Sequence, residues 1–194
     1  MSSLTTVANN FSIYTYHFVN RKMSFQIASF DIGIKNFAVC VAMVTPVSHS
    51  LKITHLALYD LSKSDSPYHA MTQVLDSIGF NEVSVILVEK QMTTNKIAIR
   101  LAQHCLSYFL ILYGRFKTII EYPSQNKTRL LGASFAERKT KKGRKDFCVR
   151  KAIEILEEMS DEKSLEIVRK AKKKDDLCDV ICMVVAYRVS FKVI

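Results

Sequence analysis

The feature that most constrains the fold is a nearly continuous apolar run, VSVILV, at residues 83–88. A strand of this composition is typically buried on both faces, as in the centre of a sheet that carries helices on both sides. The run stops at Glu89, so a carboxylate stands at the end of this strand. We therefore expect a layered fold with residues 83–88 near its centre.

The rest of the chain supplies partners for this strand. β-prone or alternating apolar segments predict strands, and apolar residues at helical spacing predict helices. The expected strands are 25–30, 37–44, 51–61, 83–88 and 117–122. The expected helices are 68–78, 95–113, 146–159, 162–173 and 174–189. Three adjacent strands followed by alternating elements predict an α/β fold, a mixed five-stranded sheet with helices on both faces.

Carboxylates stand at two strand ends and at one helix start. Asp31 ends the first strand and Glu89 the fourth. If these strands are parallel neighbours, they lie about 5 Å apart, and both acids reach the sheet edge where open α/β sheets bind ligands. Asp179 shares a helical face with Asp176 or with Asp175, since they are three and four residues apart. Acids in a first helical turn are also ordinary caps, but one acid is enough for a cap.

Such a set of oxygen ligands suits Mg²⁺ or Mn²⁺. Two ions about 4 Å apart activate a water and stabilise the leaving oxygen when a phosphodiester is hydrolysed. The net charge of +10 favours an anionic partner, of which nucleic acid is the commonest. A basic protein that is merely soluble is the alternative. The sequence thus predicts a metal site and a nucleic-acid partner.

Four short motifs spread over residues 25–190 add a resemblance. They are D-I-G-I-K-N from Asp31, V-E-K-Q around Glu89, P-S-Q-N-K ending at Lys127 with L-G at 131–132, and K-K-D-D-L-C-D ending at Asp179. In this order they resemble the RuvC-like Holliday-junction resolvases of the poxvirus and large-DNA-virus type, in the ribonuclease H-like superfamily. Ribonuclease H proper carries its glutamate on a helix, so the strand-end Glu89 favours the RuvC branch.

The resemblance implies a ribonuclease H-like fold and a Mg²⁺-dependent endonuclease, with Mn²⁺ as a substitute ion. It implies a homodimer that nicks opposed strands of a four-way DNA junction. The catalytic residues and metal ligands carried over are Asp31, Glu89, Asp176 and Asp179, with Asp175 as the alternative to Asp176 in the D-D doublet. The alternative functions are a non-catalytic junction- or DNA-binding module and a nuclease of the same fold acting on flaps or RNA. The intact set of acids argues against the non-catalytic module.

Basic residues are the candidates for DNA binding. Residues 138–145, RKTKKGRK, hold six basic residues in eight positions. This pattern predicts a flexible phosphate-binding loop, with a solvated charged face as the alternative. No aromatic residue is interleaved, so base stacking is not expected from it. The candidates are Lys35, Asn36, Lys127, Arg138, Lys139, Lys141, Lys142, Arg144 and Lys145.

Two of these positions have competing interpretations. Lys127 follows the expected fifth strand, where it either holds the scissile phosphate as a point charge or is an ordinary surface lysine. Gly33 follows Asp31 by two residues, and a missing side chain there either lets DNA or a metal approach the main chain or simply forms a turn.

The expected helix 95–113 has two roles to reconcile. The simplest interpretation of its apolar stripe is that it packs into the hydrophobic core. The stripe consists of Ile97, Leu101, Cys105, Tyr108, Phe109 and Leu112. The resemblance implies that this helix also helps to form a two-fold dimer interface. Tyr108, Leu112 and Tyr113 are the candidates for that interface.

The cysteines and the N-terminal residues bear on location. Five cysteines without a C-x-x-C pair argue against zinc and a disulfide framework and fit a reducing compartment. No apolar stretch approaches the roughly 18 residues of a membrane span, so no membrane partner is expected. Residues 1–22 lack acids and resemble a mitochondrial presequence weakly. We prefer a disordered or upstream-start extension before a single domain at 23–194. The expected location is the host cytoplasm (viral factory) or the virion, with the mitochondrion as the alternative.

Overall fold

The computed structural model describes residues 24–45 and 50–190. Five strands form one sheet in the order β3-β2-β1-β4-β5. They are β1 (Phe25–Asp31), β2 (Phe37–Thr45), β3 (Ser50–Tyr59), β4 (Val83–Glu89) and β5 (Thr118–Tyr122). β1 is antiparallel to β2 and parallel to β4, which is parallel to β5. The mixed five-stranded sheet is confirmed, while the predicted extension 1–22 lies outside the described residues.

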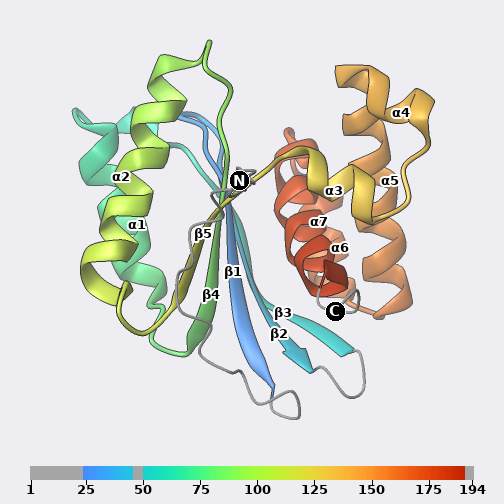
Figure 1. Cartoon of the computed structure of the whole chain (residues 1–194), viewed down its shortest axis with the longest axis horizontal. Helices are drawn as coiled ribbons and strands as arrows, with labels where there is room; N and C mark the ends of the chain where they lie inside the picture. The colour runs from blue at the N-terminus through green and yellow to red at the C-terminus, as the bar shows by residue number, and fades with distance from the viewer. Residues whose placement is uncertain (1–23, 46–49, 191–194) are drawn as a thin grey trace, which may run out of the picture.

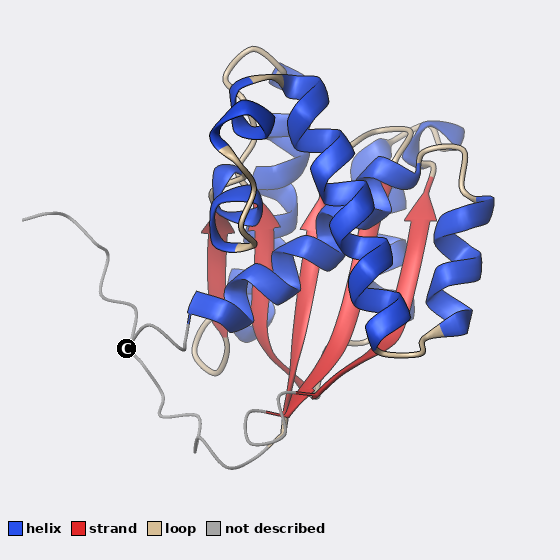
Figure 2. Cartoon of the chain, turned by 90° about the vertical axis from the view of Figure 1, so that its right-hand side faces the viewer, coloured by secondary structure: helices blue, strands red, loops and turns tan. Residues whose placement is uncertain are grey.

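Helices cover both faces of this sheet, as expected. Figure 1 shows α1 and α2 on one face and α3 to α7 on the other. The helices are α1 (Pro67–Ile78), α2 (Lys96–Tyr113), α3 (Gln125–Leu130), α4 (Phe135–Lys139), α5 (Lys141–Glu158), α6 (Glu162–Lys170) and α7 (Lys174–Ser190), and a 3-10 turn, η1, spans Leu61–Lys63. Figure 2 shows how the helices of the second face lie across the strands.

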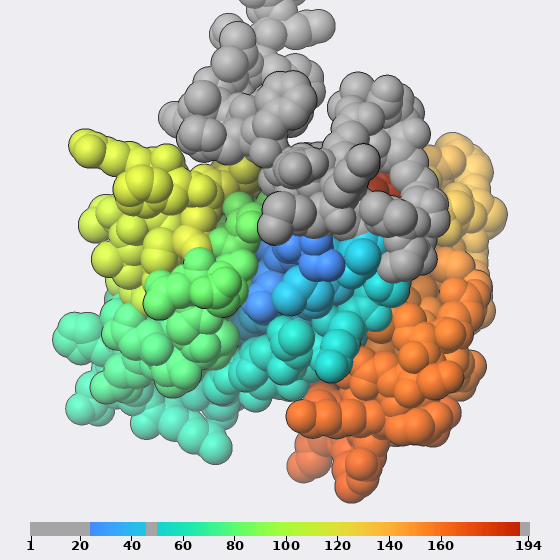
Figure 3. Space-filling model, turned by 90° about the horizontal axis from the view of Figure 1, so that it is seen from below, coloured from blue at the N-terminus to red at the C-terminus, as the bar shows by residue number. Residues whose placement is uncertain are grey.

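The alternation of side chains along β1 divides the core in two. Phe30 packs on the α1–α2 side, where its ring centroid lies 5.2 Å from that of Phe109 and 5.7 Å from that of Phe80. Ile27 belongs to the second cluster, on the α7 side. α7 is buried almost throughout, from Leu177 to Ala186, because it lies between the sheet and α5. From below, the strands are visible between the two helical layers (Figure 3).

Helix boundaries differ from the expectation around residues 124–146. The six-residue α3 and the five-residue α4 were not predicted, because segments this short show no helical periodicity. α5 begins at Lys141 rather than at residue 146, since the Thr140 hydroxyl caps it by accepting from the Gly143 backbone N–H. Residues 138–145 therefore form the end of one helix and the start of the next.

The cysteines behave as the sequence suggested. Cys40, Cys105, Cys148, Cys178 and Cys182 are all buried free thiols. They act as small core side chains. Among the described residues, no helix has both the length and the apolar character that crossing a membrane requires.

Candidate metal centre and basic face

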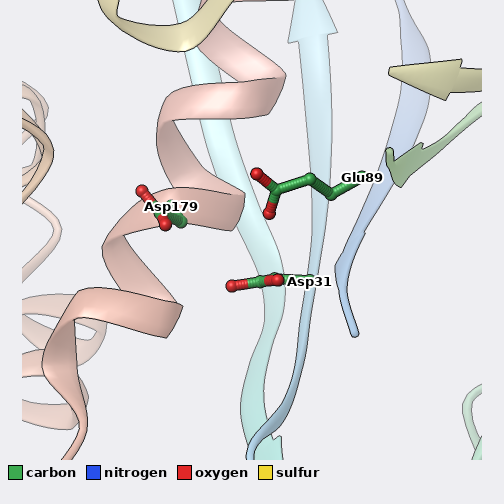
Figure 4. Close-up of side chains that lie close together, drawn as sticks. All are labelled: Asp31, Glu89 and Asp179. Atoms are coloured by element: carbon green, nitrogen blue, oxygen red, sulfur yellow. The ribbon is translucent and has the colours of Figure 1, made fainter. Parts of the chain in front are cut away.

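Three carboxylates meet where β1, β4 and α7 come together. β1 and β4 are parallel neighbours with Phe30 opposite Val88, so Asp31 and Glu89 end the two strands side by side. Asp179, in the second turn of α7, lies close to both (Figure 4). One oxygen from each of the three carboxylates lies within 4.8 Å of the other two. We call Asp31, Glu89 and Asp179 the acidic cluster.

A buried serine fixes α7 beside this cluster. Ser29 is fully buried, and its hydroxyl donates to the backbone carbonyl of Val180 over 2.8 Å. Ser29 shares the α7 face of β1 with Asp31, because strand residues two apart point to the same side. The bond thereby sets the position of Asp179, the neighbour of Val180. Sequence reasoning missed Ser29, although a small polar residue inside an apolar strand, two before a candidate ligand, is a recognisable signal.

Lys127 lies inside the acidic cluster rather than on the surface. Its Nζ is 2.9 Å from Glu89 Oε1 and 3.1 Å from Asp179 Oδ2. Only 4% of the residue is exposed. The interpretation of Lys127 as an ordinary surface lysine is therefore wrong, because α3 carries its side chain into the core. Buried charges need a partner of opposite sign, and here the ammonium group and the carboxylates are each other's partners.

The pKa values in the cluster reflect burial and crowding. Burial raises the pKa of Asp31 well above its ordinary value, and the charge of Glu89 raises it further. Burial also raises the pKa of Asp179, against the opposing effect of Lys127. Burial alone would lower the pKa of Lys127, but the neighbouring carboxylates outweigh it and hold that pKa above the usual range. The carboxylates thus favour a bound positive charge.

Asp175 and Asp176 lie outside the acidic cluster. Burial raises the pKa of Asp175, but an ion pair with Lys145 outweighs it and lowers that pKa. Burial and the charge of Asp175 raise the pKa of Asp176 to about 6. Asp176 precedes Asp179 by one helical turn, the spacing of neighbours on one face. Which of the two acids is a fourth ligand remains a prediction.

The turn after β1 carries two of the predicted DNA contacts. Lys35 is exposed and Asn36 is half-buried. A Cβ at Gly33 would lie 2.8 Å from the backbone oxygen of Asn36, so the turn itself accounts for this glycine. The phosphate contacts of Lys35 and Asn36 remain predictions.

Residues 138–145 belong to two helices and not to the predicted loop. Ser134 and Glu137 form a capping box at the start of α4, and Arg150 Nη2 on α5 reaches Glu137 Oε1 over 2.7 Å. The prediction of a flexible loop is therefore wrong, because capped helices with a cross-link replace it. We call the exposed residues of this segment the basic face; they are Arg138, Lys139, Lys141, Lys142 and Arg144. Lys145 is half-buried and is paired with Asp175.

The apolar stripe of α2 is only partly core. Leu101, Cys105 and Phe109 are buried, as predicted, but Ile97 and Leu112 are exposed near the two ends of the helix. Tyr108 is half-buried and its hydroxyl donates to Asp76 Oδ1 over 2.6 Å. The exposed apolar residues of α2 are Ile97, Leu110, Ile111 and Leu112, and Ile111 is 81% exposed.

The sequence matches a known protein family and viral relatives. A family model described as "Poxvirus A22 protein" matches residues 26–190. An uncharacterized protein, 170L, of Invertebrate iridescent virus 6 is 32% identical over 127 residues, which cover 56% of this chain and 52% of that protein. The chain therefore spans about half the length of this curated relative.

Solved structures show the same fold. The fowlpox virus resolvase in complex with substrate Holliday-junction DNA matches with a TM-score of 0.63 and 21% identity, over 86% of this chain and 99% of that one. RuvC of T. thermophilus in complex with a Holliday-junction substrate matches with a TM-score of 0.60 and 12% identity, over 87% and 96%. The predicted ribonuclease H-like fold is confirmed.

Proposed function

The chain belongs to the Poxvirus A22 protein family, and on that premise we propose that it is a structure-selective endodeoxyribonuclease that resolves four-way DNA junctions. The observation that carries the proposal is the acidic cluster at the shared end of β1, β4 and α7. The fowlpox and T. thermophilus proteins of the same fold are both described with Holliday-junction DNA, which supports this substrate.

Mg²⁺ is the metal that we propose for the site, with Mn²⁺ as a substitute. Oxygen ligands alone fit these hard cations, and Asp31, Glu89 and Asp179 already converge within 4.8 Å. Asp176 is the fourth ligand that we propose, with Asp175 as the alternative. When bound, such ions supply an activated water and stabilise the leaving oxygen of the phosphodiester. Glu89 is buried and Asp31 is half-buried, so bulk water screens their attraction for a cation less than it would at the surface.

Two-fold symmetry follows from the substrate that we propose. A four-way junction has two equivalent strands to cut, and a symmetric dimer presents one site to each. The exposed apolar residues of α2 are the surface that we propose for the two-fold contact, with Ile111 at its most exposed point. Tyr108 is half-buried and its hydroxyl donates to Asp76 within its own chain, so we prefer the exposed residues as candidates.

Phosphate contacts would come from the basic face and from the turn after β1. The residues of the basic face are exposed, and backbone contacts of this kind position a protein without reading sequence. The viral family and the iridescent-virus relative favour a viral setting, in the host cytoplasm or the virion, over the mitochondrial alternative.

The competing functions are a junction-binding module without catalysis and a nuclease that acts on flaps or RNA. A module that only binds DNA has no need of three crowded, mutually repelling carboxylates, one of them buried and two half-buried, since such groups cost stability. The acidic cluster therefore favours an enzyme.

The test is nicking of a synthetic four-way junction beside linear duplex, a flap and an RNA hairpin, with and without Mg²⁺. We expect cleavage of the junction alone and only with the metal. Asp31→Asn and Glu89→Gln should abolish cleavage and keep junction binding in a gel shift, because loss of a carboxylate also removes repulsion toward phosphate. Preferred cleavage of the flap or the RNA would move the proposal to that substrate.

A further inference from the structure

We propose that Lys127 is the built-in counter-cation of the metal-free site, and that metal binding displaces its ammonium from Glu89 and Asp179. The inference rests on the proposed function, since it concerns the same site. Lys127 Nζ lies 2.9 Å from one carboxylate and 3.1 Å from the other, and the residue is almost fully buried. An ammonium group thus contacts two of the three side chains that would ligate a metal.

Charge balance makes lysine and metal competitors. Asp31, Glu89 and Asp179 bring three carboxylates within 4.8 Å of one another, an arrangement that needs a cation nearby. With Lys127 in place, a divalent ion must take over the carboxylate oxygens that the ammonium occupies. The ammonium group therefore stabilises the three carboxylates when no metal is bound, and it lowers the affinity of the site for a metal. Once displaced, its charge is available to the phosphate of the substrate.

Metal titration without DNA tests this directly. Lys127→Met should unfold at a lower temperature than wild type in EDTA, and its affinity for Mn²⁺, measured by calorimetry, should rise at least about tenfold. Lys127→Arg keeps the charge and should not gain affinity. The matched control is Lys151→Met, since Lys151 is also paired with an acid, Glu154, but outside the acidic cluster and away from the candidate fourth ligands. This control should leave Mn²⁺ affinity unchanged.

A second measurement covers the case in which Lys127→Met does not fold. In wild type, the ¹⁵Nζ signal of Lys127 should be protected from exchange in EDTA and should lose that protection as Mg²⁺ is added. Unchanged or weaker Mn²⁺ binding by Lys127→Met, or an Nζ signal that Mg²⁺ does not alter, would overturn the inference. Because neither readout uses cleavage, Mg²⁺-dependent junction nicking can stand while this inference fails.

A different observation carries a second inference: we propose that Phe135 stacks on a base of the branched DNA. Phe135 is 76% exposed, whereas Phe30 on the sheet and Phe109 on α2 are fully buried. It opens α4, the helix that also carries Arg138 and Lys139 of the basic face. Figure 1 shows α4 beside α5, at the end of the molecule toward which β1 and β4 run.

The helix holds this aromatic ring in place for such a contact. The Ser134–Glu137 capping box and the Arg150–Glu137 ion pair tie α4 to α5, so the exposed ring is presented from a fixed backbone. Basic side chains beside an exposed aromatic suit nucleic acid whose bases can unstack, as at the centre of a junction. The sequence prediction that 138–145 makes no stacking contact is unaffected, because the ring lies just before that segment.

Paired substitutions test the stacking contact. Phe135→Ala should weaken junction binding roughly 5- to 150-fold, leave duplex binding unchanged and leave the salt dependence of binding unaltered. Phe135→Trp should retain affinity. Phe116→Ala is the matched control, because Phe116 is 78% exposed but precedes β5, at the opposite edge of the sheet.

The direct readout is the fluorescence of 2-aminopurine placed at the crossover of the junction. Binding of wild type and of Phe116→Ala should change the fluorescence of the 2-aminopurine by the same amount. Binding of Phe135→Ala should leave this fluorescence unchanged. Equal junction affinity and equal fluorescence for Phe135→Ala and wild type would refute the contact. A loss of dimerisation in Phe135→Ala would assign the ring to a protein interface instead and would equally refute it.

Discussion

Asp176→Asn is expected to stabilise the metal-free protein while removing a ligand. Burial and the charge of Asp175 raise the pKa of Asp176 from 3.8 to about 6 in the folded protein. The folded state therefore prefers the protonated acid, and the charged form costs stability above pH 6. Roughly two pKa units correspond to about 3 kcal/mol at pH 7. Since neighbouring charges relax, we expect a gain of about 1–3 kcal/mol in the free energy of unfolding.

Urea unfolding in EDTA at pH 7.5 and at pH 4 measures this gain. Because the cost disappears as the pH falls from about 6 toward 4, the variant and wild type should be equally stable at the lower pH. Asp175→Asn is the matched control. It removes a partly exposed ion pair with Lys145 and relieves the repulsion of Asp176, so its stability should change by no more than about 1 kcal/mol. A destabilised Asp176→Asn, or an equal gain at both pH values, would refute the reasoning.

The same pair of variants decides the ligand register. If Asp176 is the fourth ligand, its variant loses junction nicking and Asp175→Asn retains it. The reverse pattern would make Asp175 the ligand and leave Asp176 as a half-buried acid that does not bind the metal. Saturating Mg²⁺ should also reduce the stability advantage of Asp176→Asn, because the metal compensates the charge in wild type.

Three further outcomes are expected. Neutralising the basic face should weaken junction and duplex binding alike and flatten the slope of log affinity against log salt by roughly 0.9 for each phosphate that is no longer neutralised; an unchanged slope would mark a merely solvated surface. Ile111→Asp should give a folded monomer by sedimentation that nicks without pairing its cuts, whereas a variant that stays dimeric would place the interface elsewhere. Lys117→Met should lower the free energy of unfolding by about 2–3 kcal/mol. The reason is that Lys117 Nζ donates to the backbone carbonyls of Phe80, Asn81 and Val83 over 2.6–2.7 Å. The control Lys96→Met, at an exposed position, should leave the free energy of unfolding unchanged.

The sheet and the two strand-end acids could be predicted because their signals are local. A run of apolar residues specifies a buried strand, and Asp31 and Glu89 follow directly from where two such strands end. Asp179 was predicted from its helical spacing, but its approach to the other two acids depends on how α7 packs. The Ser29 bond to Val180, 151 residues away in the chain, fixes that packing, and no local pattern contains it.

The basic segment and Lys127 show where local reasoning fails. A run of charges suggests a flexible loop, although the S-x-x-E pattern at Ser134 is a recognisable helix start. A surface position is the ordinary expectation for Lys127, because lysine is rarely buried without a partner. Its partners, Glu89 and Asp179, lie 38 and 52 positions away in the sequence, so only the folded chain shows that this lysine contacts the acidic cluster.

The central claim is tested most directly by cleavage of a supercoiled plasmid that extrudes a cruciform. With Mg²⁺, wild type should convert it to linear product by paired cuts across the junction and leave a control plasmid without the inverted repeat intact. Asp31→Asn should bind the cruciform and leave it uncut. Cutting that is independent of the cruciform, or that survives in Asp31→Asn, would contradict the assignment of a junction resolvase whose metal is held by the acidic cluster.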